Sequence, residues 1–582
     1  MGTMFVLDRI RDIATHEPGR PALRADGRSI DYGELVTTAT KLGDLLRDHG
    51  AGPEDVVATV LPRGSNSIIA ILGIWMAGAA YLPTDAKWPG RRLDLALAES
   101  ATHVLEEAAD GEAEARMPDG KGLRVRRLRG NRGSSPNPGW DARNLAYVLH
   151  TSGSTGTPNA VGVEFGALDN YGRYLHDLAR RPAVHPDGEM RVLLSANLCF
   201  DASLRPVLLL TAGATLVVAP DLTDGSWQDH IDCIRDNGIT VISGVPSWYS
   251  GLLGAGYRPR ESGVRLAFIG GEAVPGGVVR ELTADGCTVV VQYGPTETTI
   301  AATGRILAGA DFTEPPIGDP IPGARIHLYR NDSLVPAAEG EAGQLYVGGA
   351  GVARGYLRNP RLTAERFVPD PSGPPGSRMF RSGDLARMLP REGYGFLGRQ
   401  DDQVKIGGYR IELGEVSSVA NRHPAVAQSV AFVHREGAHP RLVACYVGSS
   451  GASEPGTEES VRDYLASELP EYLVPAVVRR LERLPVTDHG KVDVAALGEF
   501  VRHGHAEEQA RPPGAHPDPA AIEAALTRHP AVAEAVTVVR AEAGDRRLVA
   551  YVVPGDGPGS CVPWPVPHRS ASGGTATTPI TR

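Results

Sequence analysis

The stretch DVVATVLPRGSNSIIAILGIWMAG, residues 55–78, indicates the fold class. Its first seven residues are mostly apolar and rich in valine, which is typical of a buried strand. The segment from Ser65 onward has the length and composition of an apolar helix. The same order returns where TLVVA is followed by SWQDHIDCIRDNG and then by ITVISGV. This alternation predicts an α/β fold in which helices cover parallel sheets.

The longest uncharged stretch, SNSIIAILGIWMAGAAYLPT (65–84), argues against a membrane partner. Its apolar run is short for a span and ends in a turn that contains proline, so we expect a helix buried against a sheet. The N-terminus lacks the basic-then-apolar pattern of a signal peptide. The five cysteines are scattered without a C-x-x-C pair, which favours reduced thiols and a cytoplasmic location.

The length of 582 residues predicts at least two domains. A net charge of −10 argues against a nucleic-acid partner. One basic run, KGLRVRRLRGNR (121–132), lies in a stretch rich in Gly and Pro, and we interpret it as a solvated surface excursion.

The pattern of predicted secondary structure changes twice after residue 320. Short strands with glycine turns, such as GQLYVGG and GYGFLGR, predict a small β-rich part, and a compact α/β stretch follows from about residue 402. We therefore expect a large core over residues 1–400, a small lobe over 401–500 and a linker over 501–521.

The C-terminal part contains an internal repeat. Residues 416–447 recur as residues 522–553, so that His423 matches His529. Two copies are too few for a solenoid, and we interpret 522–555 as a partial repeat of the small lobe. Residues 556–582 are rich in Pro, Gly, Ser and Thr, which predicts a disordered tail.

The segment LHTSGSTGTPNAVGV (149–163) has the composition of a phosphate-binding loop. Glycines let the backbone approach an anion, while amide and hydroxyl groups supply donors. The P-loop pattern requires a lysine directly after its second glycine, whereas Gly156 is followed by Thr157, Pro158 and Asn159. A polyphosphate held here would need a cation from elsewhere in the chain. The alternative is an ordinary glycine turn before a strand.

Nine stretches, in this order, resemble the core motifs of the adenylate-forming superfamily, and most closely the amino-acid-activating adenylation domains of nonribosomal peptide synthetases. They cover the chain from about residue 30 to 495. They are DYGEL (31–35), MAGAAYLPTD (76–85), LAYVLHTSGSTGTP (145–158), FDAS (200–203), QYGPTE (292–297), GQLYVGGAGVARGYL (343–357), RSGDL (381–385), GRQDDQVKIGGYRIELGEV (398–416) and LPVTDHGKVD (484–493).

The resemblance implies both a fold and a reaction. The fold would be a large N-terminal domain of two helix-covered sheets with a small distorted β-barrel, followed by a small mobile C-terminal α/β domain. With ATP and Mg²⁺, an amino-acid carboxylate would attack the α-phosphorus to give an aminoacyl-adenylate and pyrophosphate. The acyl group would then pass to the phosphopantetheine thiol of a carrier protein. No carrier attachment motif is visible after residue 500, so we expect the carrier in trans, and an MbtH-like accessory protein is a further expected partner.

The resemblance also assigns the nucleotide site. Tyr293 would lie against the adenine, Thr296 on the α-phosphate and Glu297 on Mg²⁺, while Asp384 would accept from the ribose hydroxyls. Arg399 would contact the ribose or a phosphate. The alternative for Arg399 is a structural ion pair with a nearby carboxylate. The remaining nucleotide-binding residues would be Thr151, Ser152, Gly153, Ser154, Thr155, Gly156, Gly271, Glu272 and Gly294.

Two assignments concern the small lobe. Lys491 would supply the missing cation, since its ammonium can lie between the substrate carboxylate and the α-phosphate. Asp401 would be the hinge about which the lobe rotates between the two half-reactions. A surface lysine and a charged linker are the respective alternatives.

Asp201 defines the subclass, because an acid at this position would pair with the substrate α-ammonium. The alternative is a surface pair with Arg205 on one helix, capped by Ser203. Polar pocket residues suggest a polar or acidic substrate side chain. The other residues carried over to the substrate pocket are Ala202, Arg205, Ser243, Phe268, Gly270, Gln292, Ile300 and Ala301.

Several positions depart from the family pattern, with consequences for rate more than for fold. Asn159 replaces a usual lysine, Phe165 a histidine, Gly407 an arginine and His489 an asparagine. Two other functions stay open. One is an acyl- or aryl-acid ligase of the same superfamily, and the other is a non-catalytic nucleotide-binding scaffold.

Overall fold

The structure is a computed structural model in which the chain divides into two compact units, Met1–Val492 and Asp493–Arg582. Each unit is described by itself. The described residues are 4–25, 27–85, 87–108, 112–128, 141–153, 158–181, 184, 189–221, 226–307, 312, 314–330, 333–390, 392–401, 403–436, 439–449, 457–485, 492–509, 532–542 and 545–554.

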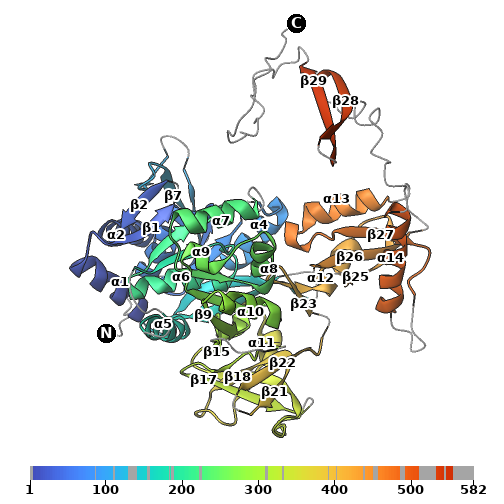
Figure 1. Ribbon diagram of the computed structural model, residues 1–582. Helices are drawn as coiled ribbons and strands as arrows, with labels where there is room; N and C mark the ends of the chain where they lie inside the picture. Colours follow the sequence, from blue (N-terminus) through green and yellow to red (C-terminus); the bar gives the residue numbers. More distant parts are fainter. Residues whose placement is uncertain are drawn as a thin grey trace. The chain divides into compact units, whose positions relative to one another are not determined.

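A nine-stranded sheet forms half of the large core (Figure 1). Its central strands are parallel, as the strand–helix alternation predicts. In spatial order the strands are β16 (Asp319–Pro320), β15 (Thr303–Leu307), β14 (Thr288–Tyr293), β13 (Leu266–Gly270), β12 (Val241–Gly244), β10 (Arg191–Leu194), β11 (Thr215–Val218), β1 (Pro21–Ala25) and β2 (Arg28–Asp31).

An eight-stranded sheet forms the other half, with parallel strands at its centre. Its strands in spatial order are β19 (Gly355–Tyr356), β9 (Asn159–Glu164), β8 (Leu145–Thr151), β4 (Ala80–Thr84), β3 (Val56–Val60), β5 (His103–Glu107), β7 (Gly122–Arg127) and β6 (Ala115–Arg116). The predicted surface excursion at 121–132 was partly wrong, because Gly122–Arg127 is strand β7. Its arginines pair with acids such as Glu106, which offsets their charge within a sheet.

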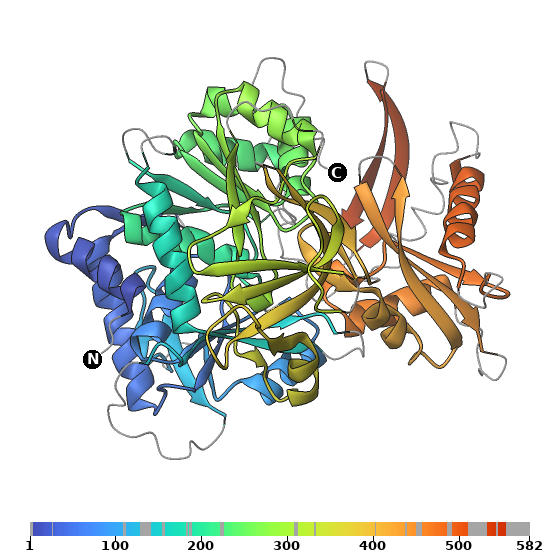
Figure 2. The ribbon, with the colours of Figure 1, turned by 90° about the horizontal axis from the view of Figure 1, so that it is seen from below.

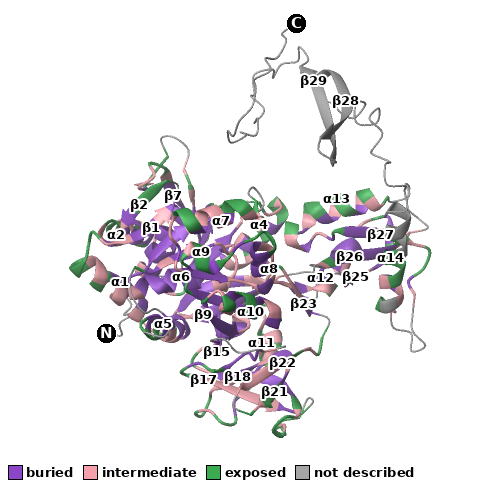
Figure 3. Ribbon diagram, in the orientation of Figure 1, coloured by how far each residue is buried: buried purple, intermediate pink, exposed green. Residues whose placement is uncertain are grey.

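The main hydrophobic core lies between these two sheets, where it joins residues of both with apolar faces of helices. The helices of this core are α1 (Phe5–His16), α2 (Tyr32–Asp48), α3 (Ser65–Met76), α5 (Phe165–Ala179) and α6 (Leu204–Leu209). Gly43 and Gly73 permit close packing of α2 on α3, since a Cβ at Gly43 would lie 3.0 Å from the Gly73 carbonyl oxygen. All residues from Ser65 to Trp75 are buried, which confirms the predicted buried helix. Figure 3 shows that buried residues are concentrated inside the large core and exposed ones on its surface.

Separate cores cover the outer faces of the sheets. The outer face of the nine-stranded sheet packs on α7 (Trp227–Asp236), α8 (Pro246–Gly254) and α10 (Gly276–Ala284), and the eight-stranded sheet is flanked by α4 (Gly90–Ser100). Two short helices, α9 (Pro259–Ser262) and α11 (Pro360–Arg366), complete the core. No helix among the described residues is long and apolar enough to cross a bilayer.

A five-stranded antiparallel sheet stands where the sequence predicts a small β-rich part (Figures 1 and 2). It contains β17 (Ala324–Tyr329), β18 (Ala342–Gly349), β20 (Phe367–Pro369), β21 (Arg378–Leu389) and β22 (Gly393–Arg399). A hairpin and a small α/β lobe follow, built from β23 (Gln403–Ile406), β24 (Tyr409–Glu412), α12 (Leu413–Ala420), β25 (Val426–Glu436), β26 (His439–Gly448), α13 (Glu458–Glu468) and β27 (Val477–Leu481). The predicted boundary between a large core and a small lobe at residue 401 stays a prediction, since residues on both sides of it belong to the first compact unit.

The second unit contains α14 (Val494–Gln509) and a hairpin of β28 (Val532–Glu542) and β29 (Asp545–Pro554). Its pairing reproduces that of β25 and β26. Val426 pairs with Gly448 and Val532 with Pro554, and a register shift follows directly in both hairpins. The sequence repeat therefore encodes the same strand pairing twice. The expected linker and disordered tail lie outside the described residues.

Candidate active site

The substrate residues predicted from the sequence gather at the carboxyl ends of the parallel strands of the nine-stranded sheet. Strand register explains why. Ser243 pairs with Phe268, and Gly270, two residues further along β13, pairs with Gln292. Because side chains alternate across a strand, these four positions share one face of the sheet. Such strand ends are the usual ligand site of open α/β sheets.

Gly270 is required by a close approach between strands. A Cβ at this position would lie 2.1 Å from the carbonyl oxygen of Gln292, which no side chain can accommodate without backbone movement. The predicted role of Gly270 in shaping the pocket therefore has a direct steric basis.

Asp201 lies in a short 3₁₀ turn, η1 (Asp201–Ser203), after β10. Its Oδ2 atom is buried and makes no hydrogen bond among the described residues, and the same holds for the Tyr147 hydroxyl nearby. Burial raises the pKa of Asp201 even though Arg205 and the Thr296 hydroxyl oppose this shift. A carboxylate with one enclosed oxygen that accepts no hydrogen bond is suited to a cationic ligand group.

The alternative of a helix-surface pair between Asp201 and Arg205 is wrong. Arg205 is 5% exposed, and its guanidinium bonds to other residues. Its Nε donates to the Tyr171 hydroxyl at 2.9 Å and its Nη1 to the Ser243 hydroxyl at 2.6 Å. Ser203 makes no side-chain cap, because its hydroxyl donates to the Phe200 carbonyl.

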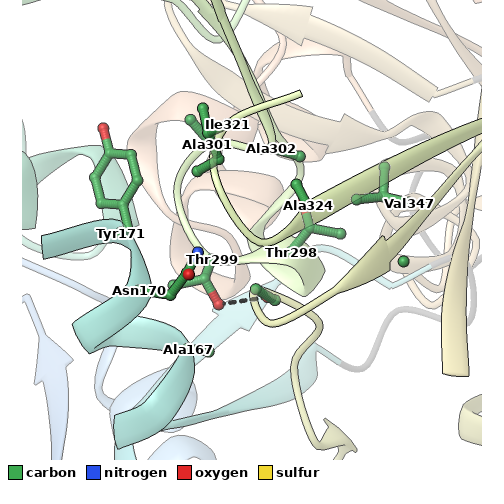
Figure 4. Close-up of a pocket in the computed structure, with 12 residues that line it drawn as sticks. Ala167, Asn170, Tyr171, Thr298, Thr299, Ala301, Ala302, Ile321, Ala324 and Val347 are labelled. Carbon is green, nitrogen blue, oxygen red and sulfur yellow. Dashed lines mark hydrogen bonds between the residues drawn. The ribbon is translucent and has the colours of Figure 1, made fainter. Parts of the chain in front are cut away.

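Tyr171, on α5, links Arg205 to Gln292, since its hydroxyl donates to Gln292 Oε1 at 2.9 Å. Tyr171 also lines a pocket between α5 and the turn after η3 (Thr296–Thr298), as Figure 4 shows. Thr299 and Ala301 lie on the same wall, and the Thr299 hydroxyl donates to the Gly351 carbonyl. Of the predicted substrate residues, only Ala301 lines this pocket.

The turn that follows β14 carries the YGPTE sequence and an unusual backbone. Thr299 and Ile300 adopt φ values of 60° and 67°, in the left-handed region that β-branched residues avoid. A Cβ at Gly294 would lie 2.5 Å from the Ala301 Cα, so glycine is needed where the two ends of the turn meet. Strained backbone of this kind is common at functional sites.

Glu297, the expected Mg²⁺ ligand, is fully buried. Both of its carboxylate oxygens lie 2.9 Å from Nη1 of Arg410, and the Tyr356 hydroxyl donates to Oε1 at 2.7 Å. Burial alone would raise the pKa of Glu297, but Arg410 and Tyr356 outweigh it and lower the pKa. The carboxylate is therefore ionised, and in this arrangement Arg410 occupies it.

Asp384 and Tyr293, the expected ribose and adenine residues, contact each other. The Tyr293 hydroxyl donates to Oδ2 of the buried Asp384, while Arg399 Nη1 donates to its Oδ1 at 2.7 Å. Arg399 also pairs with Asp401 at 2.6 Å. The structural ion pair expected as the alternative for Arg399 is thus present, and it connects the ribose carboxylate to the predicted hinge.

The phosphate loop begins at the end of β8, where its first residues meet the small lobe. The Ser152 hydroxyl donates to the Arg410 carbonyl at 2.8 Å and accepts from the Glu412 amide. The Gly153 amide donates to Oε2 of Glu415, whose Oε1 is 3.0 Å from Arg92. A carboxylate therefore occupies a donor that would otherwise be available to a phosphate. Ser154, Thr155, Gly156 and Lys491 lie outside the described residues.

Two further nucleotide-binding predictions, Gly271 and Glu272, directly follow β13. Gly271 adopts a φ of +87°, and the neighbouring Glu272 accepts from the Ser247 and Gly408 amides. Ala202 lies beside Asp201 in η1, and Thr151 ends β8.

The sequence reasoning missed the charged residues that the hairpin and α12 bring to the site. Arg410 and Glu415 lie inside the GRQDDQVKIGGYRIELGEV stretch, and their place in that motif was the available signal. Lys405 also lies here, where burial lowers its pKa more than Asp384 raises it. Tyr147, Tyr171 and Arg92 gave no signal, since a tyrosine or arginine in a helix or strand is usually structural.

The chain matches two known protein families. Residues 10–357 match the family "AMP-binding enzyme", and residues 415–491 and 521–568 match "AMP-binding enzyme C-terminal domain". The second match covers both copies of the internal repeat.

Similar proteins include peptide synthetases. Novobiocin biosynthesis protein H of Streptomyces niveus is 37% identical over 83% of this chain and 81% of that protein. A dimodular nonribosomal peptide synthase of Bacillus subtilis is 34% identical over 84% of this chain, which spans only 20% of that synthase. The solved structure of holo-PA1221, a nonribosomal peptide synthetase protein with adenylation and carrier domains, superposes with a TM-score of 0.72 at 27% identity, over 84% of this chain and 83% of that one.

The sheet edge, the unpaired Oδ2 atom of Asp201 and the family matches agree with the motif resemblance. This chain belongs to the AMP-binding enzyme family and has the adenylation-domain architecture of nonribosomal peptide synthetases.

Proposed function

We propose that this protein activates an amino acid with ATP and passes it to a carrier protein. The substrate carboxylate attacks the α-phosphorus, forming an aminoacyl-adenylate as the bond to pyrophosphate breaks. The thiol of a phosphopantetheine arm then attacks the acyl carbon, and AMP leaves. The similarity to peptide synthetases and to an adenylation–carrier protein supports this reaction and a carrier partner. The free thiols of the described cysteines favour the cytoplasm as its location.

The observation that carries this proposal is the enclosed Oδ2 atom of Asp201. A buried carboxylate oxygen that no donor satisfies is costly, and a substrate α-ammonium would complete its hydrogen bonding. An acyl- or aryl-acid ligase has no cationic group to place there. Asp201 therefore favours an amino acid over a simple carboxylic acid.

Glu297 is the residue that would hold Mg²⁺. The described residues contain no cluster of three metal ligands, and a single buried carboxylate suits a cation that takes its other ligands from nucleotide phosphates and water. Mg²⁺ would supply charge neutralisation at the phosphates. Arg410 must leave the oxygens of Glu297 before this can happen.

The contacts between the small lobe and the core suggest which half-reaction this position of the lobe serves. Arg410 pairs with the metal-binding carboxylate, and Glu415 accepts from the phosphate loop. Both contacts compete with bound ATP and Mg²⁺. We infer that this arrangement belongs to the step after pyrophosphate has left, and that rotation at Asp401 exchanges it for one in which Lys491 reaches the substrate. An MbtH-like accessory protein stays a prediction.

Exchange of radiolabelled pyrophosphate into ATP tests the proposal. The full chain is assayed with a panel of amino acids and of carboxylic acids that lack an amine. Exchange with amino acids alone supports the proposal. Exchange only with acids lacking an amine would establish the acid ligase, and ATP binding without any exchange would establish the scaffold.

Asp201→Asn keeps the shape of the side chain and removes its charge. We expect a loss of at least about 100-fold in kcat/KM for amino acids, because a buried charged pair loses one partner. Asp48→Asn, at an exposed position of α2, is the matched control and leaves exchange unchanged. Full activity of Asp201→Asn would refute the role of Asp201.

A further inference from the structure

Arg205 is a buried cation whose described partners are all neutral. Its guanidinium donates to the hydroxyls of Tyr171 and Ser243 and lies 5.5 Å from the centre of the Phe268 ring. Among the described residues, no carboxylate lies within ion-pair distance of it. The nearby acids Glu297 and Asp384 are paired with other arginines. A buried charge with only dipolar partners is compensated incompletely.

Asp201 is the acid that could balance Arg205, because it lies four residues earlier in the chain. The two charges attract each other, but Oδ2 of Asp201 has no hydrogen-bond partner among the described residues. The pKa of Asp201 stays raised, so Arg205 does not offset the effect of burial. Because Asp201 and Arg205 are close in the chain but form no ion pair, they are suited to bind opposite charges of one ligand.

Gln292 provides an independent observation. It is 3% exposed, its Oε1 accepts from the Tyr171 hydroxyl, and its Nε2 has no partner among the described residues. Tyr171 accepts from the Arg205 cation, so its own proton is directed to the acceptor oxygen of Gln292. This chain of hydrogen bonds orients the amide and leaves its NH₂ group free as a donor.

We propose that the amino acid activated at this site carries an acidic side chain, which the guanidinium of Arg205 and the amide of Gln292 bind. The inference rests on the proposed function, in which Asp201 binds the α-ammonium. A planar guanidinium binds an anionic group through parallel N–H···O bonds. A neutral side chain would leave the charge of Arg205 unbalanced, and a site built in this way discriminates strongly against ligands that lack the matching group.

Pyrophosphate exchange with the wild-type chain tests the inference directly. The panel comprises aspartate, glutamate, 2-aminoadipate, cysteate and O-phosphoserine, with asparagine, glutamine, leucine and lysine as neutral and cationic comparisons. We expect an acidic member to exceed its neutral counterpart by at least about 100-fold in kcat/KM. The carboxylate, sulfonate and phosphate members identify which anion is bound.

Two failures give different results in this assay. A neutral or cationic amino acid as the best substrate, with the acidic ones inactive, would overturn the inference and leave the proposed function intact. Exchange with no amino acid at all would refute the proposed function itself.

Variants of Arg205 connect the preference to this residue. Arg205→Gln is expected to lower the ratio of acidic to neutral kcat/KM by about 100-fold, whereas Arg205→Lys preserves the direction of the preference with a higher KM. Tyr171→Phe retains the ring but removes the hydroxyl that orients Gln292, so KM for the acidic substrate rises more than kcat falls. An unchanged ratio in Arg205→Gln would overturn the inference.

Arg173→Ala is the matched control. Arg173 is exposed on the same helix as Tyr171 and stacks on Phe5. Its substitution leaves the substrate preference unchanged. Thermal unfolding of each variant confirms folding. If Arg205→Gln does not fold, the wild-type panel and Tyr171→Phe still decide between acidic and neutral substrates.

Discussion

Arg410→Ala tests whether the small lobe is held on the core by the ion pair of Arg410 with Glu297, the proposed Mg²⁺ ligand. Nη1 of Arg410 lies 2.9 Å from both oxygens of Glu297, which is fully buried. The variant leaves this carboxylate with the Tyr356 hydroxyl as its partner. Breaking a buried ion pair costs about 3–5 kcal/mol. Since the Arg410 side chain is 20% exposed, we use the lower end, ~3 kcal/mol, for its contribution to docking.

Amide hydrogen exchange measures this effect without requiring turnover. Three amides donate across the contact between lobe and core: Gly153 to Glu415, Gly408 to Glu272 and Glu412 to the Ser152 hydroxyl. A loss of ~3 kcal/mol corresponds to an increase of about 100-fold in the fraction of undocked lobe. We expect these amides to exchange about 100-fold faster in the variant.

The control separates docking from general destabilisation. Arg422→Ala removes an exposed arginine of the same lobe, and it is expected to leave the three amides unchanged. Amides of the β25–β26 ladder serve as an internal reference, because their partners lie within the lobe. Equal exchange in Arg410→Ala and wild type would refute the view that this ion pair holds the lobe.

Three further predictions concern stability and nucleotide affinity. Burial, together with the charge of Arg92, lowers the pKa of His150 from 6.5 to about 4 in the folded protein. As the pH falls, the imidazole is therefore protonated at a higher pH in the unfolded chain than in the folded one. The free energy of unfolding should therefore decrease by up to about 3 kcal/mol between pH 6.5 and 4, and an equally steep decrease in His150→Gln during denaturant titration would contradict this. Gly270→Ala forces a Cβ to 2.1 Å from the Gln292 oxygen, and we expect a loss of at least about 1–3 kcal/mol by thermal unfolding. Gly277→Ala, with space around its Cβ, should be neutral or stabilising. Asn159→Lys restores a cation beside the phosphate loop and should lower KM for ATP several-fold, and an unchanged KM would show that this departure has no effect.

Local patterns predicted much of this protein from the sequence. Periodicity identified the α3 helix and its flanking strands, because burial on both faces of a parallel sheet demands continuous apolar runs. The motifs predicted site roles for Asp201, Glu297 and Asp384 through the family resemblance, and these roles stay predictions. The repeat at 522–553 was visible in the sequence, and its register shift appears in both hairpins. By contrast, the strand in the basic run 121–132 was missed, because its arginines are balanced by acids of β5, a pairing that local composition does not reveal.

Only the tertiary structure decided which charged and polar side chains pair with one another. Arg410 and Glu297 are separated by more than a hundred residues, and so are Tyr171 and Gln292. The packing of α6 between the sheets decides whether Arg205 faces solvent or the interior. The residues next to Arg205 in the sequence carry no information about that packing. Electrostatic and hydrogen-bond partners depend on distance in space and on burial, so a pattern along the chain can nominate a charged residue, but only the fold determines what neutralises it.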